Sequence, residues 1–376
     1  MKISFIGLGG VPFSKRATDV RLSSFVDLFQ SLGHEVEIIN RFSNIKNSSD
    51  YPYHIYEPYK KTIASNKMVF IIVYFLSLIQ EPFVIIKSNK KKHIDILFNN
   101  SAHFIDILIY SIISKIIKAK LIHQYCEFRS VFENRNIYHN INGRLVDRVS
   151  PKLWDGAICI SHFLEDSCKS INPKLKTIKV YPICDFDYFN SIQPKNIQKK
   201  YILYCGSCDY IEVINFIIKS YNKSLCKSSF DLIMVIRGNQ NTIEQLKQQN
   251  PNITFLEKLE YSDLISWYKS ASALLIPMRD NIRDLARYPN KICEYCASSG
   301  IIITTNYGEI PYLFKNEYNA LISKEYSTDS FAEELNKLEN NDAIIKSIKE
   351  NAYITGQKYF ETSAYKESIN TFLHEL

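Results

Sequence analysis

Short apolar segments alternate with helical segments in two successive runs along this chain. The first run opens with an apolar strand at Lys2–Ile6, and the second opens with a strand at Tyr201–Cys205. Between the two runs, 182–200 mixes Pro, Asp, Asn and Lys without periodicity and is interpreted as an interdomain linker. Strand–helix–strand repeats produce parallel sheets with right-handed crossovers. The alternation therefore predicts an α/β protein with two Rossmann-like domains, each built on its own parallel sheet.

The composition suits a folded protein of this size. The 376 residues, 46% of them hydrophobic, are enough for two domains with packed cores. A formal net charge of +7 is compatible with anionic substrates or an anionic membrane surface, and it falls short of a nucleic-acid footprint. Because the apolar run of Met1–Gly7 is too short for a signal peptide, we expect a cytoplasmic protein with reduced cysteines.

Two of the cysteine pairs have Cys-x-x-Cys spacing, Cys205/Cys208 and Cys293/Cys296. Zinc ribbons place their pairs much closer together in sequence. We interpret these thiols as small buried hydrophobes, with a shared metal site as the alternative.

One apolar segment, Met68–Ile79, is long enough for an interaction with a membrane to be considered. It is shorter than the roughly 18 residues of a spanning helix, and Gln80-Glu81-Pro82 is expected to end it. A lysine-rich stretch, Lys87–His93, follows. A buried helix with a solvated loop is one interpretation. The other interpretation is that the apolar segment inserts partially into a membrane face while the lysines bind anionic lipid headgroups.

The segment from Arg287 to Tyr295 carries the strongest functional signal. It places Lys291 and Glu294 on the first turns of a helix that opens after Pro289. Helix N-termini favour phosphate, Lys291 adds positive charge, and Glu294 can accept hydrogen bonds from sugar hydroxyls. The nearby loop with Gly308 and Glu309 offers backbone N–H groups. Together these residues predict a sugar-nucleotide pocket, although a surface pair of Lys291 and Glu294 would have the same spacing.

Other candidates follow expected strands. Gly9 and Gly10 lie where the backbone would approach a diphosphate or an acceptor closely, unless they form an ordinary turn. Gly206 opens the second domain, and Arg237-Gly238 ends a strand in a way that suits a nucleotide phosphate or base. Arg16 and Arg21 are candidates for binding an anionic acceptor, and solvated surface side chains are the alternative.

These motifs resemble glycosyltransferase family 4. The Pro289-Asn-Lys-x-x-Glu-Tyr295 helix, the strand ending in Thr304-Thr305, and Gly308-Glu-Ile-Pro311 are similar to the family's donor half. The stretches Trp154–Ser161 and Ser31–Val36 are similar to its N-terminal half. The resemblance covers nearly the whole chain.

The resemblance implies the GT-B fold, in which two Rossmann-like domains face each other across a cleft. It implies an acceptor-binding domain at 1–183, a nucleotide-sugar donor domain at 184–355, and a C-terminal helix at 356–376 that crosses back to the N-terminal domain. A break expected near Gly356 in the last helical region agrees with this division.

The resemblance also implies the activity, which is transfer of a sugar from a nucleotide diphosphate sugar, UDP- or GDP-linked, with retention at the anomeric carbon. No metal or other cofactor is expected. The implied acceptor is a glycan or a lipid-linked oligosaccharide of bacterial O-antigen, capsule or other surface polysaccharide. The protein would then attach peripherally to the inner face of the cytoplasmic membrane, and we expect no nucleic-acid partner.

Two candidates for the reaction come from the first domain, in addition to Lys291 and Glu294. His103 lies where the resembled family places a polar residue on the transferred sugar, and a structural histidine is the alternative. Glu127 is a candidate acceptor-hydroxyl ligand or base, and an exposed ion pair with Arg129 is the alternative.

The chain departs from the family pattern at two places. Many members have a second glutamate eight positions before the one at 294, where this chain has Ala286. Many also carry Arg and Lys in the loop that corresponds to 205–212, which here has neither. Neutralisation of the phosphates is therefore expected from Arg237, Arg279, Arg287 and Lys291.

Other functions remain open from the sequence. The departures allow a non-catalytic relative that acts as a binding partner in polysaccharide assembly, and a sugar-nucleotide epimerase would have a similar two-domain shape. A dinucleotide oxidoreductase is disfavoured, because Pro12 occupies the third glycine position and Asn40-Arg41 lacks the expected acid.

Overall fold

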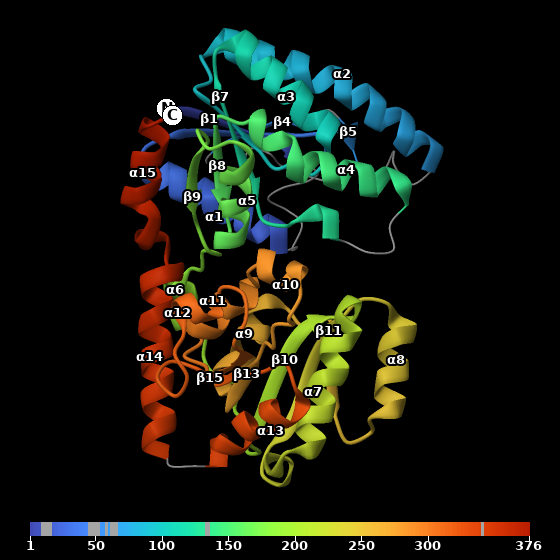
Figure 1. The fold of residues 1–376 in the computed structure, drawn as a ribbon, viewed down its shortest axis with the longest axis vertical. Helices are drawn as coiled ribbons and strands as arrows, with labels where there is room; N and C mark the ends of the chain where they lie inside the picture. The colour runs from blue at the N-terminus through green and yellow to red at the C-terminus, as the bar shows by residue number, and fades with distance from the viewer. Residues whose placement is uncertain (9–16, 44–52, 57–58, 61–66, 132–135, 340–341) are drawn as a thin grey trace. The chain divides into compact units, whose positions relative to one another are not determined.

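The computed structural model describes residues 1–8, 17–43, 53–56, 59–60, 67–131, 136–339 and 342–376 (Figure 1). The chain forms two compact units. The first comprises Met1–Tyr181 and Tyr365–Leu376, and the second comprises Pro182–Ala364.

The first unit is built on a parallel sheet of seven strands in the order β4-β2-β1-β6-β7-β8-β9. Its strands are β1 (Lys2–Leu8), β2 (Glu35–Asn40), β4 (His54–Tyr56), β6 (Ile96–Asn99), β7 (Lys120–Tyr125), β8 (Gly156–Cys159) and β9 (Lys176–Lys179), and β3 (Phe42–Ser43) pairs separately with β5 (Tyr59–Lys60). The central strands β6 and β8 are buried along their whole length and mostly apolar, as expected for a parallel sheet covered on both faces.

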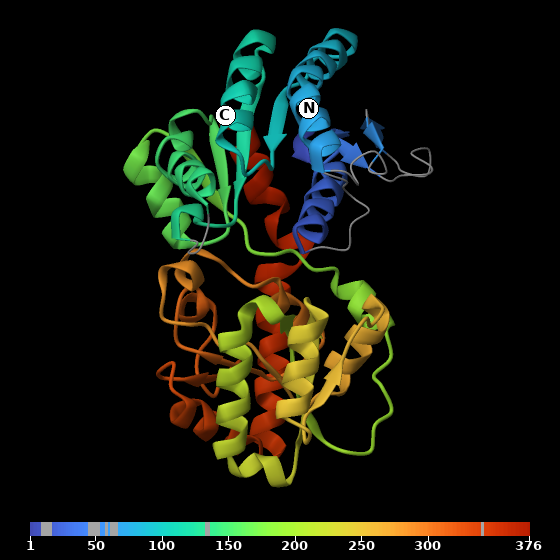
Figure 2. The same cartoon turned by 90° about the vertical axis from the view of Figure 1, so that its right-hand side faces the viewer.

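The helices of this unit are α1 (Ala17–Ser31), α2 (Lys67–Lys91), α3 (Phe104–Ile117), α4 (Ile137–Arg148), α5 (His162–Ile171) and α15 (Lys366–His374). Helix α2 contacts α3, and α3 contacts α4 (Figure 2). The C-terminal helix α15 packs on β9. A Cβ atom at Gly156 would lie 2.9 Å from the Phe372 ring, so glycine at this position allows the close approach of α15.

The second unit contains a parallel sheet of six strands in the order β12-β11-β10-β13-β14-β15. Its strands are β10 (Tyr201–Ser207), β11 (Asp231–Arg237), β12 (Thr254–Leu256), β13 (Ala273–Leu275), β14 (Ile302–Thr305) and β15 (Leu321–Ser323). Its helices are α6 (Phe186–Ser191), α7 (Ile211–Lys223), α8 (Gln240–Gln249), α9 (Tyr261–Ser270), α10 (Ile282–Ala286), α11 (Asn290–Ala297), α12 (Ile310–Leu313), α13 (Thr328–Asn336) and α14 (Asp342–Phe360). Helices α7 and α13 bury their apolar faces in one core against the sheet.

The predicted fold class, two Rossmann-like domains with parallel sheets, is confirmed. Three local expectations are wrong. The segment 182–200 contains helix α6, because the Asp185 side chain accepts a hydrogen bond from Tyr188 N at 2.9 Å and caps it. Helix α2 continues through Pro82 to Lys91. Helix α14 continues through Gly356, where a Cβ atom would lie 2.5 Å from Cys296 Cβ, so this glycine allows close packing and marks no break.

Candidate functional site

Lys291, on the first turn of α11 in the second unit, forms an ion pair with Glu294 one turn further along the helix. Lys291 Nζ lies 2.7 Å from Glu294 Oε2, and the two side chains are 28% and 9% exposed. The Tyr261 hydroxyl lies 3.5 Å from Glu294 Oε1 on the other side. Burial disfavours the charged form of Lys291, but the Glu294 carboxylate outweighs it and raises the lysine pKa. Lys291 therefore stays cationic at neutral pH.

Two neighbouring parallel strands, β10 and β11, end at the edge of the sheet from which the chain leaves β13 toward α11. Arg237, the last residue of β11, is exposed and repels Lys291 electrostatically, which lowers the pKa of Lys291 slightly against the larger effect of Glu294. The ends of these strands and the start of α11 thus place two cations, Arg237 and Lys291, at one edge of the sheet.

Gly238 follows Arg237 with a φ of +138°, which a side chain rarely adopts. A Cβ atom there would lie 2.1 Å from Cys208 Sγ, and Asn239 N donates to the same sulfur at 3.0 Å. Glycine is therefore required where the turn after β11 packs on the turn after β10.

Asp284 is the centre of a buried charge cluster that the sequence did not single out. Its side chain is fully buried and accepts hydrogen bonds from Arg279 Nε and Nη2, each at 3.0 Å. Arg287 Nε lies 2.9 Å from Asp284 Oδ1. Burial raises the pKa of Asp284, but the two arginines more than offset it and hold the pKa below its usual range. Since Asp284 is fully engaged, it does not stand in for the glutamate missing at Ala286.

Three arginines gather around Tyr210 in the loop after β10. The guanidinium carbons of Arg279, Arg283 and Arg287 lie 5.6, 4.9 and 4.5 Å from the centre of its ring. Contacts of this kind are favourable cation–π interactions. The 205–212 loop has no Arg or Lys of its own, and these contacts bring positive charge to it from 279–287.

Arg279 is less available to a ligand than the sequence suggested. Besides Asp284, it contacts Glu212 through Nη1 at 3.1 Å, and its side chain is 12% exposed. We therefore assign Arg279 a structural role and look to Lys291, Arg237 and Arg287 for phosphate contacts. The signal that could have revealed the cluster is the spacing of four between Arg279, Arg283 and Arg287.

The remaining donor candidates lie at the carboxyl ends of β10 and β14. Gly308 adopts a φ of +62°, and a Cβ atom there would lie 3.0 Å from Asp284 O, which ties its loop to the charge cluster. Glu309 is 2% exposed, and its backbone starts α12. At Gly206, a Cβ atom would lie 2.3 Å from the Tyr204 hydroxyl.

The candidates of the first unit are more dispersed. His103 lies at the start of α3, where its Nδ1 is buried without a hydrogen-bond partner among the described residues, and burial lowers its pKa. Glu127 is exposed and lies 3.6 Å from Arg129, so the ion pair considered above forms. Arg21 is buried and donates to Val180 O at 2.7 Å. The three other candidates, Gly9, Gly10 and Arg16, lie outside the described residues.

The cysteines of both Cys-x-x-Cys pairs are free and buried. In the described part of the chain, no group of three or more His, Cys, Asp or Glu is placed to hold a metal ion. The sequence contains an Asp-x-Asp pattern at Asp185-Phe-Asp187, where Asp185 serves as the cap of α6.

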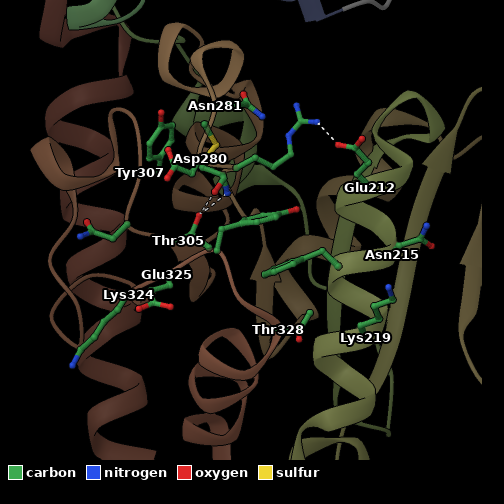
Figure 3. A pocket seen from close by; sticks show the side chains of 15 residues that line it. Glu212, Asn215, Lys219, Asp280, Asn281, Thr305, Tyr307, Lys324, Glu325 and Thr328 are labelled. Atoms are coloured by element: carbon green, nitrogen blue, oxygen red, sulfur yellow. Dashed lines mark hydrogen bonds and ion pairs between the residues drawn. The ribbon is translucent and has the colours of Figure 1, made fainter.

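A pocket of about 920 Å³ opens elsewhere on the second unit (Figure 3). Glu212, Asn215 and Lys219 of α7 line one side, and residues that follow β13, β14 and β15 line the other, among them Tyr307 and Lys324. Of the donor candidates in the second unit, Arg279 is the one that lines this pocket. Arg279, which lines it and also binds Asp284, connects it to the charge cluster.

Comparison with known proteins gives a match in the second unit. Residues 186–355, slightly under half of the chain, match the family model described as glycosyl transferases group 1. No curated protein sequence matches the chain.

Solved structures match over the whole chain at low sequence identity. Sucrose-phosphate synthase from Thermosynechococcus elongatus is 12% identical with a TM-score of 0.76, covering 100% of this chain and 98% of that one. HepE of Anabaena, crystallised with UDP and glucose, is 12% identical with a TM-score of 0.71 and full coverage of both chains. The lipopolysaccharide outer core galactosyltransferase WaaB is 12% identical with a TM-score of 0.67, covering 100% of this chain and 99% of that one. These similarities show the fold. The match at 186–355 shows a glycosyl transferases group 1 domain in the second unit, and the chain as a whole has the GT-B fold.

Proposed function

We propose that this enzyme transfers a sugar from a nucleotide diphosphate sugar to a hydroxyl of a glycan acceptor, with retention at the anomeric carbon, as in glycosyltransferase family 4. The observation that carries the proposal is the Lys291–Glu294 pair at the start of α11, at the same edge of the sheet as Arg237 at the end of β11. The cations Lys291 and Arg237 at this edge suit a diphosphate, and the Glu294 carboxylate suits sugar hydroxyls. The UDP and UDP-glucose complexes of HepE favour a uridine nucleotide over GDP.

The second unit would bind the donor. Lys291, Arg237 and Arg287 contact the phosphates in this proposal, and Glu294 accepts hydrogen bonds from hydroxyl groups of the donor. The loop with Gly308 and Glu309 contributes backbone N–H groups. Two further positions, Gly206 near the end of β10 and Gly238 after β11, are proposed to let the nucleotide approach the backbone at this edge of the sheet.

The proposed reaction breaks the bond between the anomeric carbon and the diphosphate oxygen. The acceptor oxygen forms its new bond to that carbon on the same face, and its proton passes to the departing diphosphate. Lys291 and the arginines stabilise the negative charge that develops on the leaving group, as fixed cations do in active sites. This charge is supplied by the chain itself, and we propose transfer without a bound metal.

The first unit would bind the acceptor. His103 and Glu127 are the proposed contacts to the reacting sugar and the acceptor hydroxyl, and Gly9, Gly10, Arg16 and Arg21 are proposed to hold the rest of the acceptor. We propose a lipid-linked oligosaccharide of bacterial surface polysaccharide, such as O-antigen or capsule, as the acceptor. An enzyme that uses it works in the cytoplasm, at the inner face of the membrane.

A thermal-shift screen against UDP, GDP, ADP and CMP and their sugars tests the donor assignment. Ligand binding to the folded state stabilises it by mass action, so one nucleotide series should raise Tm above the others. Proton NMR of the product then reports the anomeric configuration. An inverted product would refute retention, and an isomerised free sugar would indicate an epimerase. Binding without turnover of any donor and acceptor would indicate a non-catalytic relative.

A further inference from the structure

The outer surface of α2 and α3 in the first unit is unusually apolar. Helix α2 exposes Ile72, Phe75, Leu76, Ile79 and Phe83, each between 49% and 67%. Helix α3 exposes Ile105, Leu108, Ile112 and Ile116, each between 41% and 64%. The spacings of three, four or seven residues place each set along one stripe of its helix, away from the buried stripe that faces the sheet. We call these two stripes the α2–α3 face.

The two stripes belong to one surface. Helix α2 leads into β6, and α3 connects β6 to β7, its neighbour in the sheet. Right-handed crossovers in the same direction place both helices on the same side of the sheet. The helices contact each other, and Figures 1 and 2 show them along one surface of the first unit.

A buried network removes acidic side chains from this face. Each helix has one acidic residue, Glu81 in α2 and Asp106 in α3. Both point inward to Arg41, whose Nε lies 2.6 Å from Glu81 Oε2 and whose Nη1 lies 2.9 Å from Asp106 Oδ2. The three side chains are 6% exposed or less. Arg41 therefore fastens the two helices side by side and leaves their outer surfaces without negative charge.

The exposed charges on the described part of the two helices are all positive. Lys87, Lys90 and Lys91 lie at the end of α2, and Lys115 and Lys118 lie at the end of α3. Since both helices precede parallel strands of one sheet, their ends meet at the edge where those strands begin. The face thus combines a broad apolar surface with a cluster of lysines at one end.

We propose that the α2–α3 face docks on an anionic lipid bilayer. Apolar side chains would enter the boundary between headgroups and acyl chains, and the lysines would contact anionic headgroups. The charge pattern favours this partner over a second copy of the chain, because two lysine clusters would repel each other. No helix in the described ranges is long and apolar enough to cross a membrane. The docking proposal rests on the proposed function only in that a lipid-linked acceptor would lie at the same membrane surface.

Flotation with lipid vesicles tests the proposal. The full chain is mixed with vesicles of phosphatidylcholine alone, or of phosphatidylcholine with phosphatidylglycerol, at low and high salt. We expect it to float with the anionic vesicles, more strongly at low salt. Lys90→Gln/Lys91→Gln should weaken this binding about 30-fold, at about 1 kcal/mol per lysine. Ile79→Ser/Phe83→Ser should weaken it at least about tenfold.

Two control variants change similar side chains in the second unit, Ile354→Ser and Lys346→Gln, both at exposed positions of α14. Both should float like wild type. Wild-type protein that stays at the bottom with anionic vesicles at low salt, or α2 variants that float as well as wild type, would overturn the proposal. A change in oligomeric state without a change in flotation would point to a second copy instead. Nucleotide binding, measured without vesicles, should be equal in all these variants, which separates this proposal from the donor assignment.

Discussion

Lys291 Nζ and Glu294 Oε2 lie 2.7 Å apart, one helical turn from each other at the start of α11. The pair is partly buried, and its two charges depend on each other. Glu294 keeps Lys291 protonated, and Lys291 compensates the carboxylate, which is 9% exposed. We infer that a donor diphosphate would approach a lysine that is already fixed in place.

Replacement of Glu294 by Gln should reduce transfer strongly while the fold is kept. The amide has the same shape as the carboxylate but no negative charge. The variant therefore lacks the charge that fixes Lys291 and that accepts hydrogen bonds from the donor hydroxyls. A hydrogen bond to a charged group contributes about 1.5–3 kcal/mol, so we expect kcat/KM to fall by roughly 10- to 150-fold. Glu350→Gln, at an exposed position on α14, is the control. Glu294→Gln with wild-type kcat/KM would remove Glu294 from the site.

Replacement of Asp284 by Ala should destabilise the second unit. Asp284 is fully buried and compensates both Arg279 and Arg287, and removal of one partner from a buried ion pair costs about 3–5 kcal/mol. Urea denaturation of the full chain measures this loss.

Glu212→Gln, the matched control, removes a 75% exposed partner of Arg279 and should change the free energy of unfolding by about 0–1 kcal/mol. If Asp284→Ala is no less stable than Glu212→Gln, Asp284 does not hold the cluster together.

His123 should make the stability of the first unit depend on pH. Its ring is buried, stacks on Trp154 and contacts Asn99 Nδ2 at 2.9 Å. Burial lowers its pKa to about 3, from 6.5. Between these values the unfolded chain binds a proton that the folded chain does not, so stability falls as the pH drops from about 6.5 toward 3, by about 1.4 kcal/mol per unit.

Urea denaturation of wild type and His123→Gln across this pH range measures the contribution. The slope of unfolding free energy against pH should be about 1.4 kcal/mol per unit smaller in the variant. Equal slopes would show that His123 is protonated in the folded protein or does not titrate in this range.

Much of the fold could be predicted from the sequence, because parallel strands buried on both faces appear as short apolar runs. The errors came from contacts between distant residues. Pro82 does not end α2, which continues to Lys91. The preceding residue, Glu81, is held by a buried ion pair with Arg41. Gly356 does not break α14, since its missing side chain makes room for Cys296.

The candidate site was predictable where it is local in sequence. Lys291 and Glu294 are three residues apart on one helix, and their pairing follows from that spacing. The spacing of four places Arg283 and Arg287 on one side of their segment, but it does not show that they contact Tyr210, which is more than 70 residues away in sequence. The same is true of Arg41, which lies far in sequence from Glu81 and Asp106.

Isothermal titration of the preferred nucleotide diphosphate into wild type, Lys291→Ala and Lys346→Ala tests the central claim most directly. Lys346 is exposed on α14 and serves as the matched control. The account predicts that Lys291→Ala weakens binding by roughly 10- to 150-fold, as expected for a lost charge-assisted phosphate contact, with circular dichroism unchanged. Lys346→Ala should bind like wild type. A folded Lys291→Ala protein that binds the nucleotide as tightly as wild type would contradict the assignment of the donor site to the start of α11.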